Sequence, residues 1–339
     1  MSVEIAAYAK LNLALAVSAP EPATAFRRAG WHRICSWFAP IALHDTLTLT
    51  ARSAGEPSVH AIVWAEDAPR PRPIDWPIEK DLAVRAHRLL EAHAGHPLPL
   101  HLHLAKRIPV GGGLGGGSSD AAAMLRGVNA LFDLGLRTVD LVRLGATLGS
   151  DIAFFLDDNA AADDLETPPR PAIVSGFGES IIRVERFRED VLLLLPEFGC
   201  ATGDVYQAFD ALIAERAQGA EPHVFDETGV WELIEMARAD RAIPAAKLFN
   251  DLAAAACVVR PELKALLEGA LRPTAIPIHM TGSGSTLFVP FDIEDDDEDG
   301  SEGEEVEAID ADEGGAINRL ADLAEQNEPT LIAIPTSLI

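Results

Sequence analysis

The sequence predicts an α+β fold, and three observations carry that prediction. Segments with the alternating pattern of half-buried strands gather toward the two ends of the chain. A stretch from about residue 203 to 271 instead has the spacing of successive helices. Strands and helices therefore come in runs and not in strict strand–helix–strand alternation. With 339 residues, the chain is long enough for one large domain or two medium ones.

Strands dominate the beginning of the chain. We expect them over residues 5–18, 44–52 and 59–65. Proline and charge mark residues 67–77 as a loop. Residues 79–95 have helical spacing and end on a glycine, which predicts a helix. Leucine alternates with histidine over residues 98–110, which predicts another strand.

A glycine-rich segment follows that strand. Six glycines occupy residues 111–117, interrupted only by Leu114. Helical spacing returns at once, and we expect helices over residues 119–135 and 138–149. Residues 157–171 are polar and rich in proline, which indicates an insertion loop. We place a domain boundary here, giving an N-terminal domain of residues 1–170 and a C-terminal domain of residues 171–339.

The C-terminal half begins and ends with strands. Short strands are expected over residues 172–174, 181–185 and 191–195. After the helical stretch, residues 277–291 have the pattern strand, glycine turn, strand. An acidic insertion of about residues 292–313 follows, and then a helix over residues 316–327 and a last strand over residues 330–339.

The charge of the chain is concentrated in that acidic insertion. The net charge is −26, and 14 acidic residues but no lysine or arginine lie between Asp292 and Glu313. We interpret the run as a solvated loop, with binding of cations or of a basic partner as the alternative. No basic patch dominates the chain, so we expect no nucleic-acid binding.

Composition also bears on the compartment. No apolar run reaches the roughly 18 residues of a membrane span, and the N-terminus has no basic leader. The three cysteines are odd in number and far apart, which argues against a disulfide framework. We therefore expect a reduced, cytoplasmic protein without a membrane partner.

The glycine-rich loop has the chemistry of a phosphate cradle. Glycines allow positive φ angles and let a ligand approach the backbone without Cβ clashes. Successive backbone N–H groups then form a concave anion site, and the following helix adds its own free N–H groups. Ser118 and Ser119 supply hydroxyl groups at the same place. The alternative is a structural turn that only permits close packing.

Two better-known glycine motifs fit poorly. A Walker A loop needs a lysine after the glycines, and none follows here. The dinucleotide pattern GxGxxG is matched by Gly111, Gly113 and Gly116, but six clustered glycines match it almost automatically. That fold also requires an acidic residue after a second strand, where this sequence predicts helix.

The loop and six other motifs resemble those of the GHMP kinases. The loop PVGGGLGGGSSDAAA is similar to the nucleotide loop of that family. The other six motifs occur in the family's order: AYAKLNLAL, GWH, GSDIAFFL, SGFGE, FNDL and MTGSGST. The resemblance covers nearly the whole chain. It implies two domains, an N-terminal α/β domain like ribosomal protein S5 and a C-terminal ferredoxin-like α+β domain.

The resemblance implies an ATP-dependent kinase that acts on a small molecule. The segments GWH and GLGGGSSDAA are most similar to those of family members that phosphorylate the 2-hydroxyl of 4-diphosphocytidyl-2-C-methyl-D-erythritol, in the non-mevalonate isoprenoid route. ATP and Mg²⁺ are then the cofactors, and we expect a monomer or a homodimer. The residues implied to hold ATP are Pro109, Val110, Gly111, Gly112, Gly113, Leu114, Gly115, Gly116, Gly117, Ser118 and Ser119. Ser119 and Asp120 are candidates to help place Mg²⁺, although no acidic cluster marks a metal site.

Two residues are candidates for the chemistry. Asp151 opens an apolar helical segment, which alone is typical of a helix N-cap. The resemblance instead implies that Asp151 is the base on the acceptor hydroxyl. Lys10 lies among apolar residues, where an unpaired charge is costly to bury. The resemblance implies that it pairs with Asp151 and polarises the acceptor oxygen; snorkelling of the lysine at a strand end is the alternative.

Four further residues are candidates to bind the substrate, together with Asp151. Asn12 shares a strand face with Lys10 because it lies two residues on. By resemblance, Trp31 stacks on the cytosine ring and His32 hydrogen-bonds to it. Tyr206 is expected to form a second aromatic wall. Each of these rings could otherwise be an ordinary core residue.

The sequence departs from the family's pattern in places. The segment before GWH lacks an aspartate, and Ala153 stands where proline is usual.

Three rival functions stay open. The nearest is another GHMP kinase, acting on mevalonate, homoserine or a sugar. The others are a dinucleotide-dependent oxidoreductase and an inactive binding protein that uses the acidic run.

Overall fold

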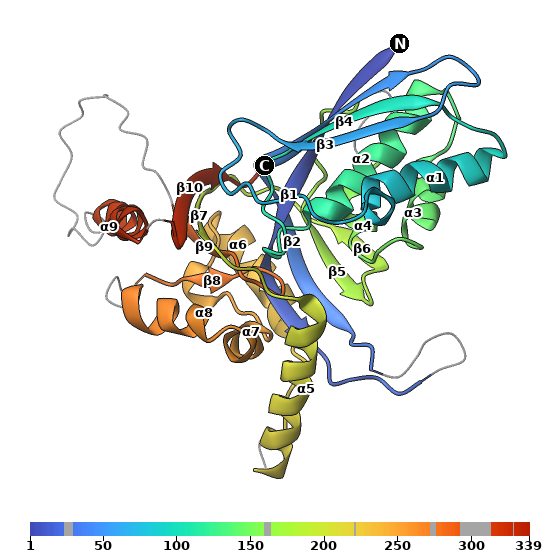
Figure 1. The fold of residues 1–339 in the computed structure, drawn as a ribbon. Helices are drawn as coiled ribbons and strands as arrows, with labels where there is room; N and C mark the ends of the chain where they lie inside the picture. Colours follow the sequence, from blue (N-terminus) through green and yellow to red (C-terminus); the bar gives the residue numbers. More distant parts are fainter. Residues whose placement is uncertain (24–29, 159–163, 220–221, 272–275, 292–312, 328) are drawn as a thin grey trace.

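A computed structural model gives the fold of the chain (Figure 1). The structure describes residues 1–23, 30–158, 164–219, 222–271, 276–291, 313–327 and 329–339. The acidic insertion therefore lies outside the described residues, except for its last position. In the described part of the chain, no helix combines the length and the apolar character that crossing a membrane would need.

The N-terminal half is built on a six-stranded sheet. Two long antiparallel strands form its centre, β1 (Ser2–Val17) and β2 (Ile34–Ala51). The sheet has the order β3-β4-β2-β5-β6, with β1 on the other edge of β2. The remaining strands are β3 (Val59–Trp64), β4 (Leu100–Lys106), β5 (Ala172–Gly176) and β6 (Ser180–Arg183). Only β3 and β4 pair in parallel among these strands.

Helices cover one face of this sheet (Figure 1). They are α1 (Leu82–Ala94), α2 (Gly116–Leu131), α3 (Thr138–Gly145) and the short α4 (Ile152–Phe155), with a 3₁₀ turn, η1 (Ile78–Lys80), before α1. The side chain of Asp81 caps α1 by accepting from the backbone N–H groups of Ala83 and Val84. Gly95 ends α1 with φ 75°, as the sequence predicts. A core of leucine, alanine and valine side chains fills the space between sheet and helices.

The C-terminal half is built on a four-stranded antiparallel sheet of order β10-β7-β9-β8. Its strands are β7 (Asp190–Pro196), β8 (His279–Met280), β9 (Leu287–Phe291) and β10 (Leu331–Ser337). The helices around it are α5 (Thr202–Gln218), α6 (Glu227–Asp240), α7 (Ala253–Val259), α8 (Pro261–Ala265) and α9 (Glu313–Gln326). Two short helical turns complete this half, η2 (Ala245–Lys247) and η3 (Leu266–Ala270).

The expected elements are present, with three differences. β2 begins at Ile34, ten residues before the predicted strand. The prediction missed this first half because it is buried on both faces and shows no alternation of apolar and polar residues. α2 begins at Gly116 and not at Ser119, so the last two glycines of the loop are helical. β5 pairs with β2 and β6 pairs with β5, so Ala172–Arg183 joins the N-terminal sheet. By sheet membership, the first half extends to Arg183 and the second begins at Asp190, and the domain boundary near residue 170 stays a prediction.

Candidate active site

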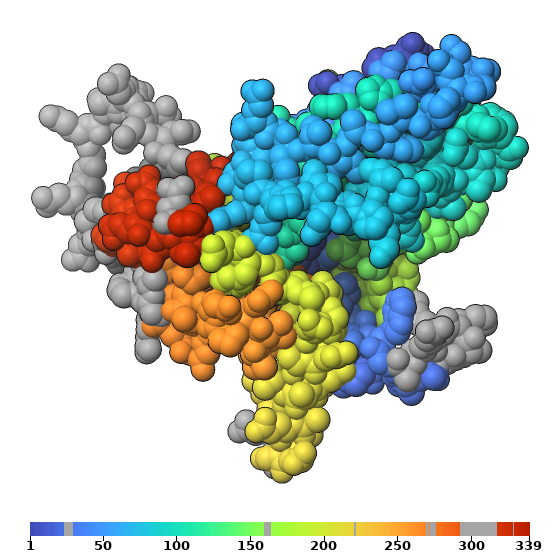
Figure 2. All heavy atoms as spheres, in the orientation of Figure 1, coloured from blue at the N-terminus to red at the C-terminus, as the bar shows by residue number. Residues whose placement is uncertain are grey.

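A cavity of about 970 Å³ lies where the two halves meet. It is lined by the glycine-rich loop and by residues of β1, the segment before α4, and the start of α5. In Figure 2 the surface is hollowed between the cyan residues of the N-terminal half and the yellow residues of α5. Of the predicted site residues, all but Ser119 line this cavity. Ser119 is buried within α2 and is 2 % exposed.

The glycine-rich loop is held from both halves of the molecule. Its Leu114 carbonyl accepts a hydrogen bond from the backbone N–H of Lys10 at 3.0 Å. Its Gly111 and Gly112 carbonyls each accept one, at 3.2 Å, from the backbone N–H groups of Cys200 and Thr286. The loop is therefore hydrogen-bonded to both halves of the molecule.

Two of the loop glycines combine a positive φ angle with close approach of other atoms. Gly113 has φ 79°, and a Cβ atom there would lie 2.3 Å from the Thr281 carbonyl oxygen. Gly115 has φ 75°, and its Cβ would lie about 3 Å from Phe155 and from the Lys10 side chain. Gly117 has no such constraint, since its Cβ would meet only Leu82, at 3.4 Å. The tight part of the loop is thus the part that faces Lys10 and the Thr281 turn.

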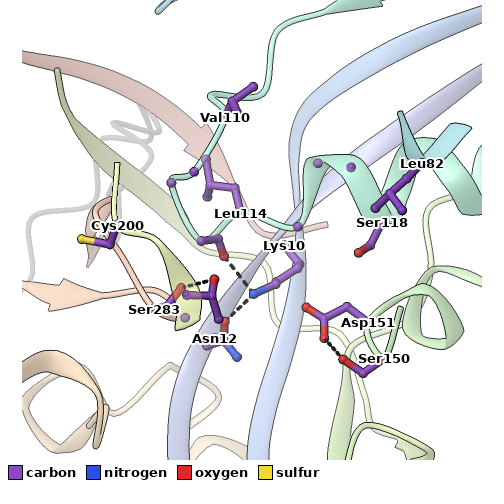
Figure 3. A pocket seen from close by; sticks show the side chains of 18 of the residues that line it. Lys10, Asn12, Leu82, Val110, Leu114, Ser118, Ser150, Asp151, Cys200 and Ser283 are labelled. Atoms are coloured by element: carbon purple, nitrogen blue, oxygen red, sulfur yellow. Dashed lines mark hydrogen bonds between the residues drawn. The ribbon is translucent and has the colours of Figure 1, made fainter. Parts of the chain in front are cut away.

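Lys10 lies under the loop and is 3 % exposed. Its ammonium donates to Asn12 Oδ1 at 2.5 Å and to the Gly113 carbonyl at 2.8 Å, and lies 4.8 Å from the Phe38 ring centre (Figure 3). Burial lowers the pKa of Lys10, and the nearby charge of Asp151 opposes that effect. The predicted direct pairing of Lys10 with Asp151 is therefore not seen. The hydrogen bonds of Lys10 go to Asn12 and to the loop, and Asp151 affects Lys10 only through its charge.

Asp151 precedes α4, but its side chain does not cap that helix. Its Oδ1 accepts from the Ser150 hydroxyl at 3.2 Å, and its carboxylate points into the same part of the cavity as the Lys10 ammonium (Figure 3). The simple N-cap interpretation therefore does not apply. Burial and, second, the Asp151 charge raise the pKa of Tyr206 to about 12, so the phenol stays protonated beside the carboxylate.

Aromatic rings line the cavity beyond Asp151. Trp31 is 51 % exposed, and the His32 ring lies 4.9 Å from the Tyr206 ring. Both ring nitrogens of His32 face protein groups: Nδ1 lies 2.9 Å from the Ser18 carbonyl and Nε2 lies 3.5 Å from Asp210 Oδ1. Trp31, His32 and Tyr206 all line the cavity, while the polar contacts of the His32 ring nitrogens go to Ser18 and Asp210.

A buried charge cluster supports the other side of the loop. Lys106, at the end of β4, donates to Asp45 at 2.5 Å and to Asp120 at 2.6 Å. Asp45 also accepts from the backbone N–H of Ile108 at 2.8 Å. All three charged side chains are at most 5 % exposed. The cluster ties β2, β4 and α2 together just where the chain enters the loop.

Sequence reasoning missed several cavity residues. Trp76 lies in the proline-rich loop and donates from its indole N–H to Asp81 at 3.2 Å. Phe177 lies in the turn between β5 and β6. Thr281 belongs to the predicted MTGSGST motif, but its contact with β1 could not be predicted: its hydroxyl oxygen accepts from the Asn12 backbone N–H at 2.8 Å. An aspartate before the periodic residues of α1 is an N-cap signal that could have located Asp81; the other contacts are long-range and leave no local pattern.

Comparison with known proteins decides the family. The model of the GHMP kinase N-terminal domain matches residues 81–159, and the model of the GHMP kinase C-terminal domain matches residues 232–309. A 4-diphosphocytidyl-2-C-methyl-D-erythritol kinase of Thermobifida fusca (strain YX) is 34 % identical over 292 residues, which are 84 % of this chain and 85 % of that protein. The chain belongs to the GHMP kinase family. Members of this family are ATP-dependent phosphotransferases, so the chain is a kinase that uses ATP.

Other relatives of this GHMP kinase agree. The protein of the same name from Moorella thermoacetica is 35 % identical over 283 residues, covering 83 % of this chain and 87 % of its own. A solved 4-(cytidine 5'-diphospho)-2C-methyl-D-erythritol kinase superposes with a TM-score of 0.65 at 28 % identity, covering 99 % of both chains. A homoserine kinase of Cytophaga hutchinsonii, with a TM-score of 0.60 and 14 % identity over 100 % of this chain and 94 % of its own, shares the fold.

Proposed function

We propose that this GHMP kinase transfers the γ-phosphoryl group of ATP to the 2-hydroxyl of 4-diphosphocytidyl-2-C-methyl-D-erythritol, a step toward isoprenoid precursors. The observation that carries the proposal is the placement of Lys10 and Asp151 in one cavity with the glycine-rich loop and the aromatic rings. Similarity to relatives named for this substrate supports the choice of acceptor. The nearest alternative remains another small-molecule acceptor of the family.

Asp151 is the proposed base on the acceptor hydroxyl. Its carboxylate points into the cavity and is not used as a helix cap, so it is available to take or orient a proton. Lys10 adds a buried positive charge beside the reacting oxygen, and Asn12 holds that lysine through its side-chain oxygen. Phosphoryl transfer needs such positioning and charge compensation more than it needs covalent chemistry.

The loop is proposed to hold the phosphates of ATP. The residues concerned are Pro109 to Ser118, which line the cavity and lead into the start of α2, and those after Pro109 can offer backbone N–H groups to the phosphates. Ser119 is removed from direct contact by its burial, and we assign it a packing role. The two aromatic residues Trp31 and Tyr206 are proposed to stack on the cytosine base, with His32 contributing its ring face and its backbone.

Mg²⁺ is proposed as the metal that accompanies ATP. Two oxygen groups of this chain suit it: the hydroxyl of Ser118 and the carboxylate of Asp120, whose Oδ1 atom is buried without a hydrogen-bond partner. Among the described residues, no group of three His, Cys, Asp or Glu side chains forms a metal cage. Most of the ligands would thus come from phosphate and water, and the metal would neutralise charge on the transferred group.

The remaining expectations stand as parts of the same proposal. We propose a cytoplasmic protein that acts as a monomer or homodimer on ATP and a small molecule. The two functional halves correspond to the two sheets, with β5 and β6 assigned to the first.

An acceptor panel tests the proposal. ADP release is measured with Mg-ATP and, in turn, 4-diphosphocytidyl-2-C-methyl-D-erythritol, mevalonate, homoserine and galactose. The expected result is release that depends on the first acceptor alone. Release with one of the others keeps the kinase and overturns the substrate. As a second readout, CDP should inhibit competitively against the acceptor, because only the proposed substrate has a cytidine group to displace.

A further inference from the structure

Phe177 lines the cavity but has no role in the account so far. It occupies the tip of the turn that joins β5 to β6. Its ring lies 6.2 Å from the ring of Trp31, with the two planes at 61°, an edge-to-face arrangement. Aromatic pairs prefer this geometry because the positive edge of one ring meets the negative face of the other.

Strand register brings these two rings together. β2 and β5 are antiparallel neighbours, and Ile34 at the start of β2 is opposite Gly176 at the end of β5. Trp31 lies three residues before Ile34, and Phe177 follows Gly176 directly. The backbone of Trp31 is itself held, since its carbonyl accepts from the Glu21 N–H at 2.8 Å. The contact is thus a consequence of the sheet and not of a chance loop conformation.

The turn that carries Phe177 is rigidly placed. Gly176 and Gly178 on either side have φ 71° and φ 102°, which side chains rarely adopt. The backbone N–H of Phe177 donates to Glu179 Oε2 at 2.5 Å. A Cβ atom on Gly178 would lie 2.7 Å from the Cβ of Ser150, so the turn packs directly on the residue before Asp151.

We propose that Phe177 is a positioning residue that fixes the orientation of the Trp31 ring and thereby sets the slot for the pyrimidine base. Trp31 is half exposed, so its side chain would lose rotational freedom when a base stacks on it. An edge contact that already restricts the ring reduces this entropy cost of binding. Because the same turn packs on Ser150, the slot is held at a fixed place relative to Asp151. This inference rests on the proposed cytidyl substrate.

Phe177→Leu removes the ring and keeps an apolar side chain. With saturating ATP, the KM for the cytidyl substrate and the inhibition constant of CDP should both rise about 3- to 10-fold, as expected for loss of one aromatic pair. The kcat and the KM for ATP should stay within twofold. Phe177→Tyr keeps the ring and should behave like the wild type. Phe187→Leu is the matched control, because Phe187 packs edge-on against Trp37, 5.8 Å away, in the core and not in the cavity.

A double-mutant cycle shows whether Phe177 acts through Trp31. In a Trp31→Ala background, Phe177→Leu should change the KM no further; additive effects overturn the proposed positioning role. An unchanged KM and CDP constant in folded Phe177→Leu, with an active wild type, overturn this inference alone. If Phe177→Leu does not fold, Phe177→Met replaces it in the same cycle. A wild type that neither turns over the cytidyl substrate nor binds CDP overturns the proposed function and this inference together.

Discussion

The Lys10 ammonium and the Asp151 carboxylate point into the same part of the cavity, while the hydrogen bonds of Lys10 go to Asn12 and to the Gly113 carbonyl. The lysine is therefore held by the protein before any substrate binds. A charge fixed in this way costs no reorganisation when negative charge develops on the reacting oxygen. The carboxylate is left to interact with the acceptor hydroxyl.

Asp151→Asn should lower kcat by about 10²- to 10⁴-fold, the usual contribution of a general base. The amide has the same shape but cannot accept the proton. The dissociation constant for ATP, measured by calorimetry, should change less than a few-fold, because Asp151 faces the acceptor side of the cavity. The neighbouring variant Ser150→Ala is the control and should retain most of the activity. An Asp151→Asn enzyme with near-normal kcat would refute the assignment of the base.

Lys10→Met should lower kcat by about 10²- to 10³-fold, as for loss of one preorganised donor. Methionine fills much of the same buried space and removes the charge, so the fold should survive. Steady-state kinetics and a circular dichroism melt are the measurements. If kcat falls less than about tenfold in a folded variant, Lys10 is a structural lysine.

Gly113→Ala and Gly117→Ala form a matched pair within the loop. At Gly113 the added methyl would collide with the Thr281 carbonyl and the residue has a positive φ, so both stability and ATP affinity should fall. At Gly117 the added methyl meets only Leu82 at an ordinary distance, so the melting temperature should change little. Equal melting temperatures for the two variants would contradict the tight loop geometry.

Lys106→Met should destabilise the fold by about 3–5 kcal/mol, because it leaves the buried carboxylates of Asp45 and Asp120 facing one another. Urea unfolding measures this change. Arg137→Ala is the control: it breaks the exposed pair of Arg137 with Asp140 and should not move the midpoint. Similar midpoints for both variants would show that the cluster does not stabilise the loop entrance.

Stability should depend on pH through His60 and His87. Their rings are joined by a 3.3 Å hydrogen bond, and His87 Nε2 donates to the Leu98 carbonyl at 2.9 Å. His87 Nδ1 must therefore accept, and His60 must donate, when both rings are neutral. Burial lowers the pKa of both histidines, so the folded state binds fewer protons than the unfolded chain below about pH 6.5.

The free energy of unfolding should accordingly decrease as the pH falls from about 6.5 toward the lower pKa values of the folded state. Urea midpoints at pH 7.5 and 5.5 measure the effect. His60→Phe keeps a ring without a proton site and should reduce the pH dependence. His96→Asn, on the exposed side of the loop after α1, should leave it as in the wild type. No difference between His60→Phe and wild type would contradict this account.

Local patterns predicted most of the elements. The N-cap and glycine signals of α1 lie within a few residues of the helix, so its bounds could be read closely. The loop could be assigned to phosphate because its glycines, serines and following helix are contiguous. By contrast, the first half of β2 is buried on both faces, and without alternation it carries no periodic signal.

The parts of the site that could not be predicted depend on tertiary contacts. Lys10 donates hydrogen bonds to Asn12 and to the Gly113 carbonyl, which lies 103 residues away in the sequence. Nothing local indicates that the Lys106 cluster would join β2, β4 and α2, or that strand register would bring Phe177 to Trp31. The resemblance supplied candidate roles, and the structure supplied the partners that hold those side chains.

The most direct test of the central claim is the product itself. Wild type, Lys10→Met and Asp151→Asn are incubated with Mg-ATP and 4-diphosphocytidyl-2-C-methyl-D-erythritol and followed by ³¹P NMR. The account predicts a new phosphomonoester resonance on the methylerythritol, next to unchanged diphosphate resonances, in the wild type and almost none in either variant. A wild type that forms no such phosphomonoester, or variants that form it at the wild-type rate, would contradict the account.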